Sequence, residues 1–322
     1  MRGASITGWS SALPDKVVTN DDLANYLDTS DEWITERTGI KERRIGGTTG
    51  GLATEAGRTA LSKAGISGDD VDLVLLATST PDAAMPPTSA LVQDNLGIRG
   101  GAADMNVACA GFVYALAAAH GMILGGLDKV LVIGADTLSR ITDQQDRTTA
   151  VLFGDGAGAV VLEANMGPDQ LLATDLGADG STRSILRCDV GGTIEMVGKE
   201  VYRQAVRICV DSITRTCDRA GVQPGDIDLF VAHQANQRII DAVMDRMKMP
   251  RERAAIVLDR TGNTSAASVP LALDDAVGAG RVHEGDLVML CGFGAGMTWA
   301  TQIWRWGAGP ASKRTDQQGR AQ

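Results

Sequence analysis

A cysteine at position 109 stands where a strand is expected to give way to a helix. The small apolar segment 102–108 leads into Cys109, and a helix-forming run from Phe112 to Leu124 follows it. Unpaired N–H groups and the positive end of the helix dipole lie at such a junction, and both favour thiolate over thiol. A thiolate placed there is an activated nucleophile for acyl transfer. The alternative for Cys109 taken alone is a small buried cysteine that fills space.

Two later segments offer partners for this nucleophile. A strand predicted over residues 226–232 ends at His233, and a helix is expected soon after it. Ligands bind at the carboxyl ends of strands in open α/β sheets, so His233 lies at the edge where a ligand is expected to bind. Asn263 lies in a tight loop that enters a helix over 269–278 and can offer a side-chain N–H, although an asparagine alone is more often a turn residue. With Cys109 they form a candidate acyl-transfer constellation.

The motifs around these residues resemble those of the β-ketoacyl-acyl carrier protein synthase III family. They read Ala-Cys-Ala-Gly-Phe, His-Gln-Ala-Asn-x-Arg and Gly-Asn-Thr-Ser-Ala-Ala-Ser in this order, and the resemblance runs from Ile6 to Trp306. An N-terminal Thr-Ser-Asp-Glu-Trp-Ile and a central Phe-Gly-Asp-Gly-Ala-Gly also match. Elongating condensing enzymes carry Cys-His-His and thiolases use a second cysteine, so Asn263 points to the type III branch or its relatives.

The resemblance implies a fold, an assembly and a reaction. The fold is α/β, namely the thiolase fold, with two duplicated halves in a five-layered α-β-α-β-α arrangement, and the assembly is a homodimer. The reaction is a decarboxylating Claisen condensation that initiates type II fatty acid synthesis. Cys109 takes the acyl group of acetyl-CoA or another short acyl-CoA, and malonyl-acyl carrier protein then yields a β-ketoacyl-acyl carrier protein, CoA and CO2. His233 and Asn263 donate hydrogen bonds to the malonyl thioester oxygen and stabilise the enolate.

The resemblance also implies a coenzyme A site. Trp33 and Arg37 are four residues apart on one face of a short helix, with Thr29 as its expected N-cap and Gly39 as its stop. An indole face stacks on adenine and a guanidinium grips phosphate, whereas without the resemblance this pair reads as packing plus a solvated charge. The family contacts to coenzyme A fall on four residues here: Trp33, Arg37, Arg147 and Asn236.

Four further roles come from the resemblance. The backbone N–H of Gly294 joins that of Cys109 in an oxyanion hole, although a glycine there also suits a tight turn. Met85 occupies the position that closes the acyl pocket, commonly with a bulky aromatic, and methionine leaves more room. The segment 187–200, which helps to cover the substrate tunnel, is shorter than in many members. The acidic carrier protein meets Arg203, Arg238 and Arg246, but Asp245 replaces a neighbouring basic residue and weakens this patch.

Composition excludes several function classes. The 322 residues are 44% hydrophobic and carry a net charge of -10, which suits a globular protein and argues against general nucleic-acid binding. Five irregularly spaced cysteines indicate a reducing compartment, and no cysteine or histidine cluster suggests a metal. Neither a transmembrane run nor a secretory signal is visible. We expect a cytoplasmic enzyme without a metal or a resident cofactor, and with no nucleic-acid or membrane partner.

The chain contains a faint internal duplication. Residues 64–77 align without gaps on residues 220–233, with five identical positions, and the glycine run 154–158 echoes 292–296. Two matches in the same order predict two related halves. The expected units are an N-terminal half over 1–168 with the nucleophile, a C-terminal half over 169–306 with His233 and Asn263, and a disordered tail over 307–322.

Two rival functions stay open at this point. A pathway-specific relative would prime a polyketide or another secondary metabolite, or pass an acyl group to an oxygen or nitrogen nucleophile, with the same three residues. An inactive thiolase-fold partner subunit would have lost the cysteine, and the intact Cys109, His233 and Asn263 argue against it.

Overall fold

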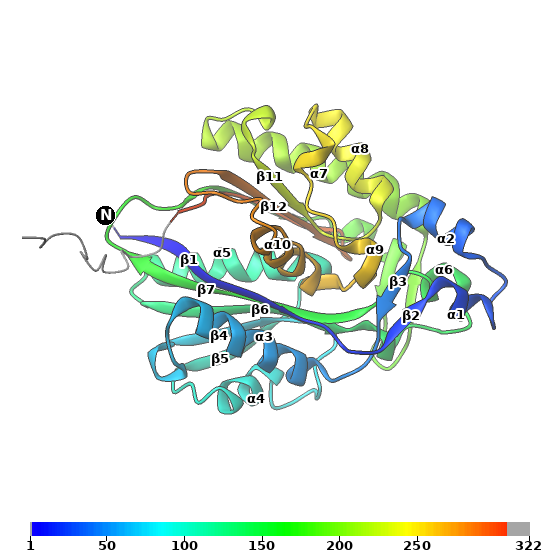
Figure 1. The fold of residues 1–322 in the computed structure, drawn as a ribbon, viewed down its shortest axis with the longest axis horizontal. Coiled ribbons are helices and arrows are strands. Elements are labelled where there is room, and N and C mark those ends of the chain that lie inside the picture. The colour runs from blue at the N-terminus through cyan, green and yellow to red at the C-terminus, as the bar shows by residue number, and fades with distance from the viewer. Residues whose placement is uncertain (1, 308–322) are drawn as a thin grey trace, which may run out of the picture.

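The computed structural model describes residues 2–307, whose strands form two main sheets (Figure 1). The first sheet has the order β1-β7-β6-β4-β5, and its strands are β1 (Gly3–Ala12), β7 (Asp155–Asn165), β6 (Lys129–Thr137), β4 (Leu73–Ala77) and β5 (Gly101–Met105). The second has the order β11-β12-β13-β8, and its strands are β11 (Leu229–Ala232), β12 (Leu287–Gly294), β13 (Thr298–Arg305) and β8 (Leu171–Ala178). Parallel pairing of β4 with β6 has its counterpart in the parallel pairing of β11 with β12.

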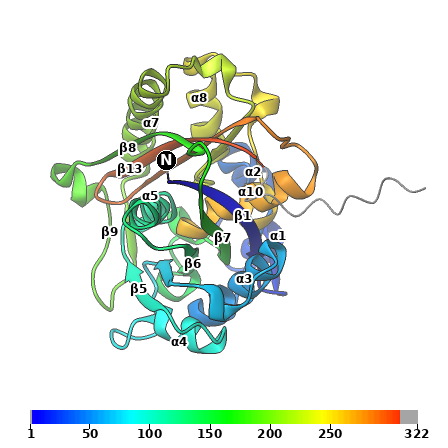
Figure 2. The same ribbon diagram turned by 90° about the vertical axis from the view of Figure 1, so that its left-hand side faces the viewer.

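Helices form three layers around the two sheets (Figures 1 and 2). Helices α5 (Gly111–Leu124) and α10 (Ser268–Gly278) lie between the sheets and share one hydrophobic core with both. The outer helices are α3 (Thr49–Ala64) and α4 (Thr88–Asn95) on the first sheet, and α7 (Gly198–Ala220) and α8 (Gln237–Met247) on the second. Helix α5 contains no Asp, Glu, Lys or Arg, because a helix covered by sheets on both sides leaves no face for charge. The predicted five-layered α-β-α-β-α arrangement is confirmed.

Shorter elements complete the fold. Figure 1 shows α1, α2, α6, β2 and β3 together at one end of the molecule. These and the remaining short elements are α1 (Asn20–Ala24), α2 (Asp31–Thr38), α6 (Arg147–Ala150), α9 (Leu258–Thr261), β2 (Val17–Thr19), β3 (Glu42–Arg44), β9 (Leu186–Cys188) and β10 (Ile194–Met196). The 3-10 turns are η1 (Gly68–Asp70), η2 (Ala108–Ala110), η3 (Leu138–Ile141), η4 (Gly180–Ile185), η5 (Pro224–Asp226), η6 (Arg251–Arg253) and η7 (Ser265–Ala267).

The faint sequence repeat corresponds to a repeated structural unit. Helices α3 and α7 each end at a left-handed glycine, Gly65 (φ 71°) and Gly221 (φ 68°). A 3-10 turn with a capping box follows in both copies, and then a strand, β4 in the first sheet or β11 in the second. Glycine adopts a left-handed conformation without a steric clash at Cβ, and so it can end a helix. The chain therefore turns back in the same way after α3 and after α7. The repeat therefore places His233 directly after β11, the strand that pairs in parallel with β12 in the second sheet.

The predicted boundary near residue 168 stays a prediction. The last strand of the first sheet ends at Asn165, and the next strand, β8 of the second sheet, begins at Leu171. Most of the predicted tail, residues 308–322, lies outside the described residues, and Gly307 is in neither helix nor strand. Within residues 2–307, no helix combines the length and the apolar character needed to cross a membrane.

Candidate active site

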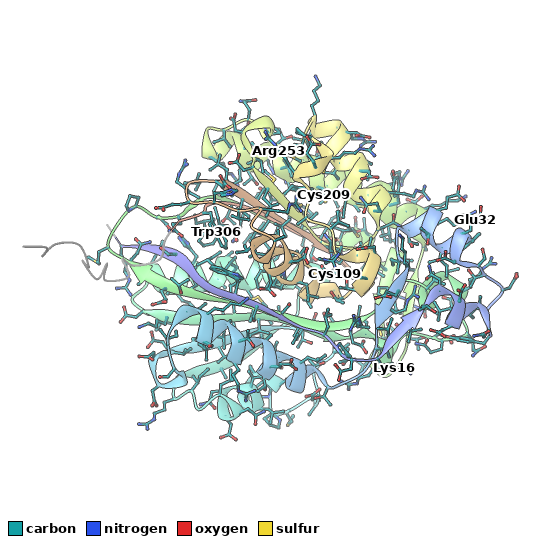
Figure 3. The ribbon with its side chains drawn as sticks, viewed as in Figure 1. Lys16, Glu32, Cys109, Cys209, Arg253 and Trp306 are labelled. Carbon is teal, nitrogen blue, oxygen red and sulfur yellow. The ribbon has the colours of Figure 1, made fainter. Side chains whose placement is uncertain are left out.

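One cavity of about 1000 Å³ collects the predicted reactive residues. Cys109 lies in η2, His233 follows β11, Asn263 precedes η7, and Gly294 ends β12, and all four line this cavity. Figure 3 shows Cys109 in the interior of the molecule, whereas Cys209 lies on the outer helix α7. Residues far apart in the sequence, from both sheets, therefore meet at one site, as a nucleophile with oxyanion donors requires.

Cys109 lies at the predicted strand-to-helix junction, but its thiol is not activated in the free chain. Strand β5 leads through η2 into α5, and Ala108 is held at φ 45°, a left-handed conformation that strains an alanine. Burial raises the pKa of the Cys109 thiol to about 12. The net direction of this pKa is therefore opposite to the thiolate expected at a helix start, and burial is its largest cause. Cys109 must lose its proton as it reacts.

A buried carboxylate missed by the sequence interpretation organises the loops around Cys109. Asp136, close to the end of β6, is fully buried and accepts hydrogen bonds from the backbone N–H of Ser79 at 2.7 Å, of Thr80 at 3.2 Å and of Ala266 at 3.1 Å. Burial raises the pKa of Asp136, and its charge adds to the rise at Cys109. A lone acid after the apolar strand 130–135 was the available signal. Asp136 ties the loop after β4 to the loop that carries Asn263.

His233 is a buried, neutral imidazole. Its backbone N–H donates to the carbonyl of Cys291 at 2.7 Å, and its ring stands edge-on to Phe293 with 5.0 Å between centroids. Nδ1 lies 2.6 Å from the hydroxyl oxygen of Ser268. Burial lowers the pKa of His233 to about 3, so the ring is neutral at pH 7 and donates from a single nitrogen.

The side chain of Asn263 is oriented by its own loop. Its Oδ1 accepts from the backbone N–H of Ser265 at 2.9 Å, and its backbone N–H donates to the carbonyl of Leu152 at 2.8 Å. Because Ser265 N–H requires an acceptor, the oxygen must take this place and the amide NH2 is left as the donor. Among the described residues this NH2 has no hydrogen-bond partner, so it is available to a bound oxygen.

Gly294 lies directly against the nucleophile. A Cβ atom at residue 294 would lie 2.6 Å from Cys109 N and 3.1 Å from Cys109 Cβ, closer than real Cβ atoms come to backbone. Only glycine lets these two backbone segments approach so closely. The approach is consistent with the predicted oxyanion hole, whose two N–H groups would come from Cys109 and Gly294.

Replacing Gly294 by alanine is expected to lower the condensation rate by about 10²–10³-fold, the range for losing one oxyanion donor. The added Cβ must push β12 away from Cys109 N. Steady-state assay of the variant measures this loss. Gly225→Ala is the matched control, because a Cβ there meets nothing within 4 Å. A Gly294→Ala enzyme as active as the control would contradict the role of Gly294.

The predicted coenzyme A residues form one cluster. Guanidinium groups of Arg37 and Arg147 lie 4.7 and 5.0 Å from the Trp33 ring centroid. Trp33 and Arg37 line the cavity of Cys109, whereas Arg147 touches it only through Trp33 and donates to the carbonyl of Asp28 at 2.6 Å. The expected N-cap Thr29 is wrong. Ser30 caps α2 by accepting from Trp33 N–H, one residue later than the capping-box spacing suggested.

Asn236 joins this cluster to the second half of the chain. Its Oδ1 caps α8 by accepting from Arg238 N–H at 2.9 Å, and its Nδ2 donates to the carbonyl of Arg37 at 3.0 Å. Asn236 also lines the cavity. One side chain therefore fixes α2 against α8 beside the substrate space.

The predicted carrier-protein arginines are exposed on two adjacent helices. Arg203 lies on α7 and is paired with Glu200, while Arg238 on α8 lies over the ring of Tyr202 at 5.6 Å. Arg246 is also exposed on α8. Asp245, expected to weaken this patch, is paired with Arg251 at 2.7 Å, so its charge is partly compensated.

The structure does not bring Met85 into the cavity of Cys109. Met85 is 83% exposed and lines a separate hollow of about 260 Å³, because the loop after β4 points it outward. A buried cluster of Leu138, Phe153 and Ile194 walls the main cavity instead. The role of Met85 in the acyl pocket stays a prediction.

The short segment 187–200 lies along the cavity of Cys109. It forms the β9–β10 hairpin, and residues from both strands line the cavity. Cys188 is exposed on this hairpin and lines the cavity too, unlike the buried Cys209, Cys217 and Cys291. Within residues 2–307, no group of three His, Cys, Asp or Glu side chains is placed to hold a metal ion.

Comparison with known proteins agrees with this geometry. A family profile described as 3-oxoacyl-[acyl-carrier-protein (ACP)] synthase III matches residues 103–180, and its C-terminal counterpart matches residues 217–306. A β-ketoacyl-[acyl-carrier-protein] synthase III of Erythrobacter litoralis is 50% identical, covering 94% of this chain and 99% of the relative. The crystal structure of 3-oxoacyl-[acyl-carrier-protein] synthase III from Aquifex aeolicus superposes with a TM-score of 0.92 at 44% identity, covering 94% and 100% of the two chains. A priming β-ketosynthase from a polyketide pathway reaches a TM-score of 0.91 at 35% identity, covering 96% and 98%.

Fold and relatives together define a thiolase-fold acyltransferase, and Cys109 lines the main cavity of this chain. Within that class, the chain belongs to the β-ketoacyl-acyl carrier protein synthase III family.

Proposed function

We propose that this protein starts type II fatty acid synthesis by condensing a short acyl-CoA with malonyl-acyl carrier protein. One observation carries the proposal. A cysteine at a helix start, a glycine N–H beside it, a neutral histidine and a free asparagine amide all line one cavity. This set matches a reaction in which a thioester is made first and an enolate oxygen is held second.

In the first half-reaction, the Cys109 sulfur attacks the acyl-CoA carbonyl. The developing oxyanion is held by the N–H groups of Cys109 and Gly294. A bond forms between the Cys109 sulfur and the acyl carbon, and the bond to the coenzyme A sulfur breaks. The proton of the Cys109 thiol passes to the departing coenzyme A thiolate, which leaves as CoA. A protonated resting Cys109 is compatible with this balance because the proton has a destination.

In the second half-reaction, malonyl-acyl carrier protein enters the same cavity. His233 and Asn263 donate hydrogen bonds to the malonyl thioester oxygen while CO2 departs. The carbanion carbon attacks the acyl-cysteine carbonyl, the new carbon–carbon bond forms, and the carbon–sulfur bond breaks. Cys109 leaves as a thiolate and takes up one proton from solvent to return to the thiol. Each preorganised hydrogen-bond donor stabilises such an oxyanion by about 3–4 kcal/mol. A neutral His233 can donate without leaving a buried charge when the product departs.

Intact-protein mass spectrometry tests the function and names the starter. The protein is mixed with a set of acyl-CoAs of different chain length, and the mass added to it identifies the preferred acyl group. We expect one short acyl group per chain, because Leu138, Phe153 and Ile194 close the wall of the cavity. No acylation by any acyl-CoA would contradict the proposal.

The coenzyme A site predicts an effect on binding alone. Trp33→Ala and Arg37→Ala are expected to weaken acyl-CoA binding by roughly ten- to a hundredfold, since base stacking in nucleic-acid sites is worth ~1–3 kcal/mol. The chemical step and the dependence on malonyl-acyl carrier protein should change less, because uniform binding is lost. Calorimetric titration measures the change. The control is Glu36→Ala, because Glu36 is an exposed residue of the same helix. Unchanged affinity in Trp33→Ala and Arg37→Ala would show that Trp33 serves only in packing.

We also propose a homodimer that acts in the cytoplasm. Strand β5 forms one edge of the first sheet and its residues are largely accessible, so its outer backbone groups are available for pairing. A second copy of this chain is the proposed partner, and light scattering in solution measures the mass. The exposed arginines on α7 and α8 are the proposed contact for the acidic carrier protein.

The alternative function is priming of a polyketide or another secondary metabolite. It rests on the 35% identity to the priming β-ketosynthase of a polyketide pathway, which is lower than the 50% identity to a β-ketoacyl-[acyl-carrier-protein] synthase III. Both functions use the same chemistry, and they differ in the acceptor. Assays with carrier proteins from the two kinds of pathway distinguish them by the relative rate of condensation.

A further inference from the structure

We propose that the hydroxyl of Ser268 fixes the tautomer of His233 by donating to Nδ1, which places the ring proton on Nε2. Ser268 then acts as a positioning residue for the reaction. The consequence for catalysis rests on the proposed function, whereas the tautomer itself is a property of the resting protein.

The geometry around Ser268 leaves its hydroxyl proton one destination. The Ser268 oxygen lies 2.6 Å from His233 Nδ1 and accepts from the backbone N–H of Gln234 at 3.2 Å. Among residues 2–307 these are its two hydrogen-bond partners. Gln234 N–H can only donate, so the serine proton is free to point at the ring. Ser268 is fully buried, so water does not compete for it.

The opposite arrangement is disfavoured by the same contacts. If His233 Nδ1 carried the proton, it would donate to the serine oxygen, which already accepts from Gln234. The serine proton would then be buried without an acceptor, at a cost that proteins avoid. Donation from serine to Nδ1 satisfies every group.

The backbone N–H of Gln234 is itself held rigidly. The Gln234 side chain is fully buried, its Nε2 donates to the carbonyls of Ala232 at 2.7 Å and of Ala255 at 3.1 Å, and its Oε1 accepts from Val257 N–H at 3.0 Å. This anchoring fixes the chain beside the end of β11. The serine oxygen is thereby pinned from one side, and its proton is directed to the other.

The position of Ser268 in the fold supports a neutral ring with this tautomer. Ser268 is the first residue of α10, whose N-terminal end carries partial positive charge. That charge opposes a second proton on the adjacent imidazole, as burial does. His233 therefore keeps one proton, and the hydrogen bond at Nδ1 decides which nitrogen holds it. With the proton on Nε2, the other side of the ring is a donor.

This assignment matters for the enolate step. A histidine with a bare Nε2 would present a lone pair to the malonyl oxygen and repel the developing charge. A histidine with Nε2–H donates to it. Removing the Ser268 hydroxyl should lower malonyl decarboxylation by roughly ten- to a hundredfold, by analogy with groups that orient metal-bound histidines. Acyl transfer to Cys109 should stay near the wild-type rate.

Nitrogen NMR measures the tautomer directly. The chain has three histidines, so protein labelled with 15N-histidine gives few ring signals, and loss of one set in His233→Gln assigns them. In the wild-type protein at pH 7 we expect a protonated Nε2 and a bare Nδ1 at His233. A protonated Nδ1 with a bare Nε2 would overturn the proposal, whatever the enzyme's activity.

Variants of Ser268 test the cause. Ser268→Ala should shift His233 toward a mixture of tautomers and lower the kcat of decarboxylation without raising the KM for acyl-CoA. Ser268→Thr keeps the hydroxyl and should restore the Nε2–H form. The matched control is Ser212→Ala on α7. It also removes a fully buried serine hydroxyl, which is hydrogen-bonded to Asp175 and Thr301. It should change stability without moving the His233 signals.

The outcomes separate this proposal from the proposed function. An unchanged tautomer and unchanged decarboxylation in Ser268→Ala would overturn the positioning role. Should Ser268→Ala fail to fold, the wild-type tautomer and the Ser268→Thr variant still decide whether Ser268 sets the tautomer of His233. Absence of acylation by any acyl-CoA would contradict the proposed function alone, since the nitrogen signals of His233 need no substrate.

Discussion

Replacing Cys109 by serine is expected to abolish acylation of the protein by acyl-CoA. A serine hydroxyl at this position lacks an activating base, because burial lowers the pKa of His233 to about 3 and makes its imidazole a weak proton acceptor. Removing the nucleophile of a well-studied serine protease costs about 10⁶ in rate, so a loss of at least a thousandfold is a conservative expectation here. Intact-protein mass spectrometry after exposure to a short acyl-CoA measures it, since the wild-type protein should gain one acyl mass.

Cys188 is the control that makes this experiment decisive. It is exposed and lines the same cavity, so it is the alternative site of labelling. Cys188→Ser should keep the added mass, whereas Cys109→Ser should lose it. Cys209, Cys217 and Cys291 are buried and do not line the cavity. Labelling that persists in Cys109→Ser would show that another cysteine carries the acyl group.

His233→Ala and Asn263→Ala are expected to lower malonyl decarboxylation by about 10²–10³-fold each. Both variants should still accept an acyl group on Cys109, because the two side chains act on the malonyl oxygen in the second half-reaction. Release of CO2 from malonyl-acyl carrier protein measures one step, and mass spectrometry of the acyl-enzyme measures the other.

Asn263→Asp sharpens the test of the asparagine. Truncation to alanine also leaves the backbone N–H of Ser265 without its acceptor, so part of its effect is structural. The aspartate keeps that acceptor and removes the amide donor, and its charge faces the enolate. We expect a loss of decarboxylation at least as large as in Asn263→Ala. A nearly normal rate in Asn263→Asp would show that the amide does not bind the malonyl oxygen.

The sequence by itself placed the reactive residues at the ends of secondary-structure elements. Apolar runs that change to helical runs mark where strands end, so the positions of Cys109, His233 and Asn263 followed from local pattern. The repeat of residues 64–77 in 220–233 indicated two equivalent units, and its glycine-terminated helices are present in both. Such features depend on neighbours in the chain, which is why sequence alone predicts them.

Local sequence patterns could not predict the electrostatics of the site. A helix start favours a thiolate, yet burial raises the pKa of Cys109 to about 12, because the surrounding loops come from distant parts of the chain. The outward position of Met85 and the open position of Cys188 on its hairpin depend in the same way on the path of loops. Even the N-cap of α2 moved from Thr29 to Ser30, since either residue can accept and only the entering backbone selects one.

Tertiary structure alone decided which side chains act through others. Asp136 meets Ala266 at a separation of 130 residues, and Ser268 meets His233 at a separation of 35. The sequence therefore predicted the family fold, and it indicated a candidate nucleophile with two candidate partners, because motifs and periodicity are local features of the chain. The pKa directions of Cys109 and His233, and the groups that orient these residues, arise only when two sheets and the helices between them pack together and bury both side chains. Burial is a property of the packed whole, and no local segment carries it.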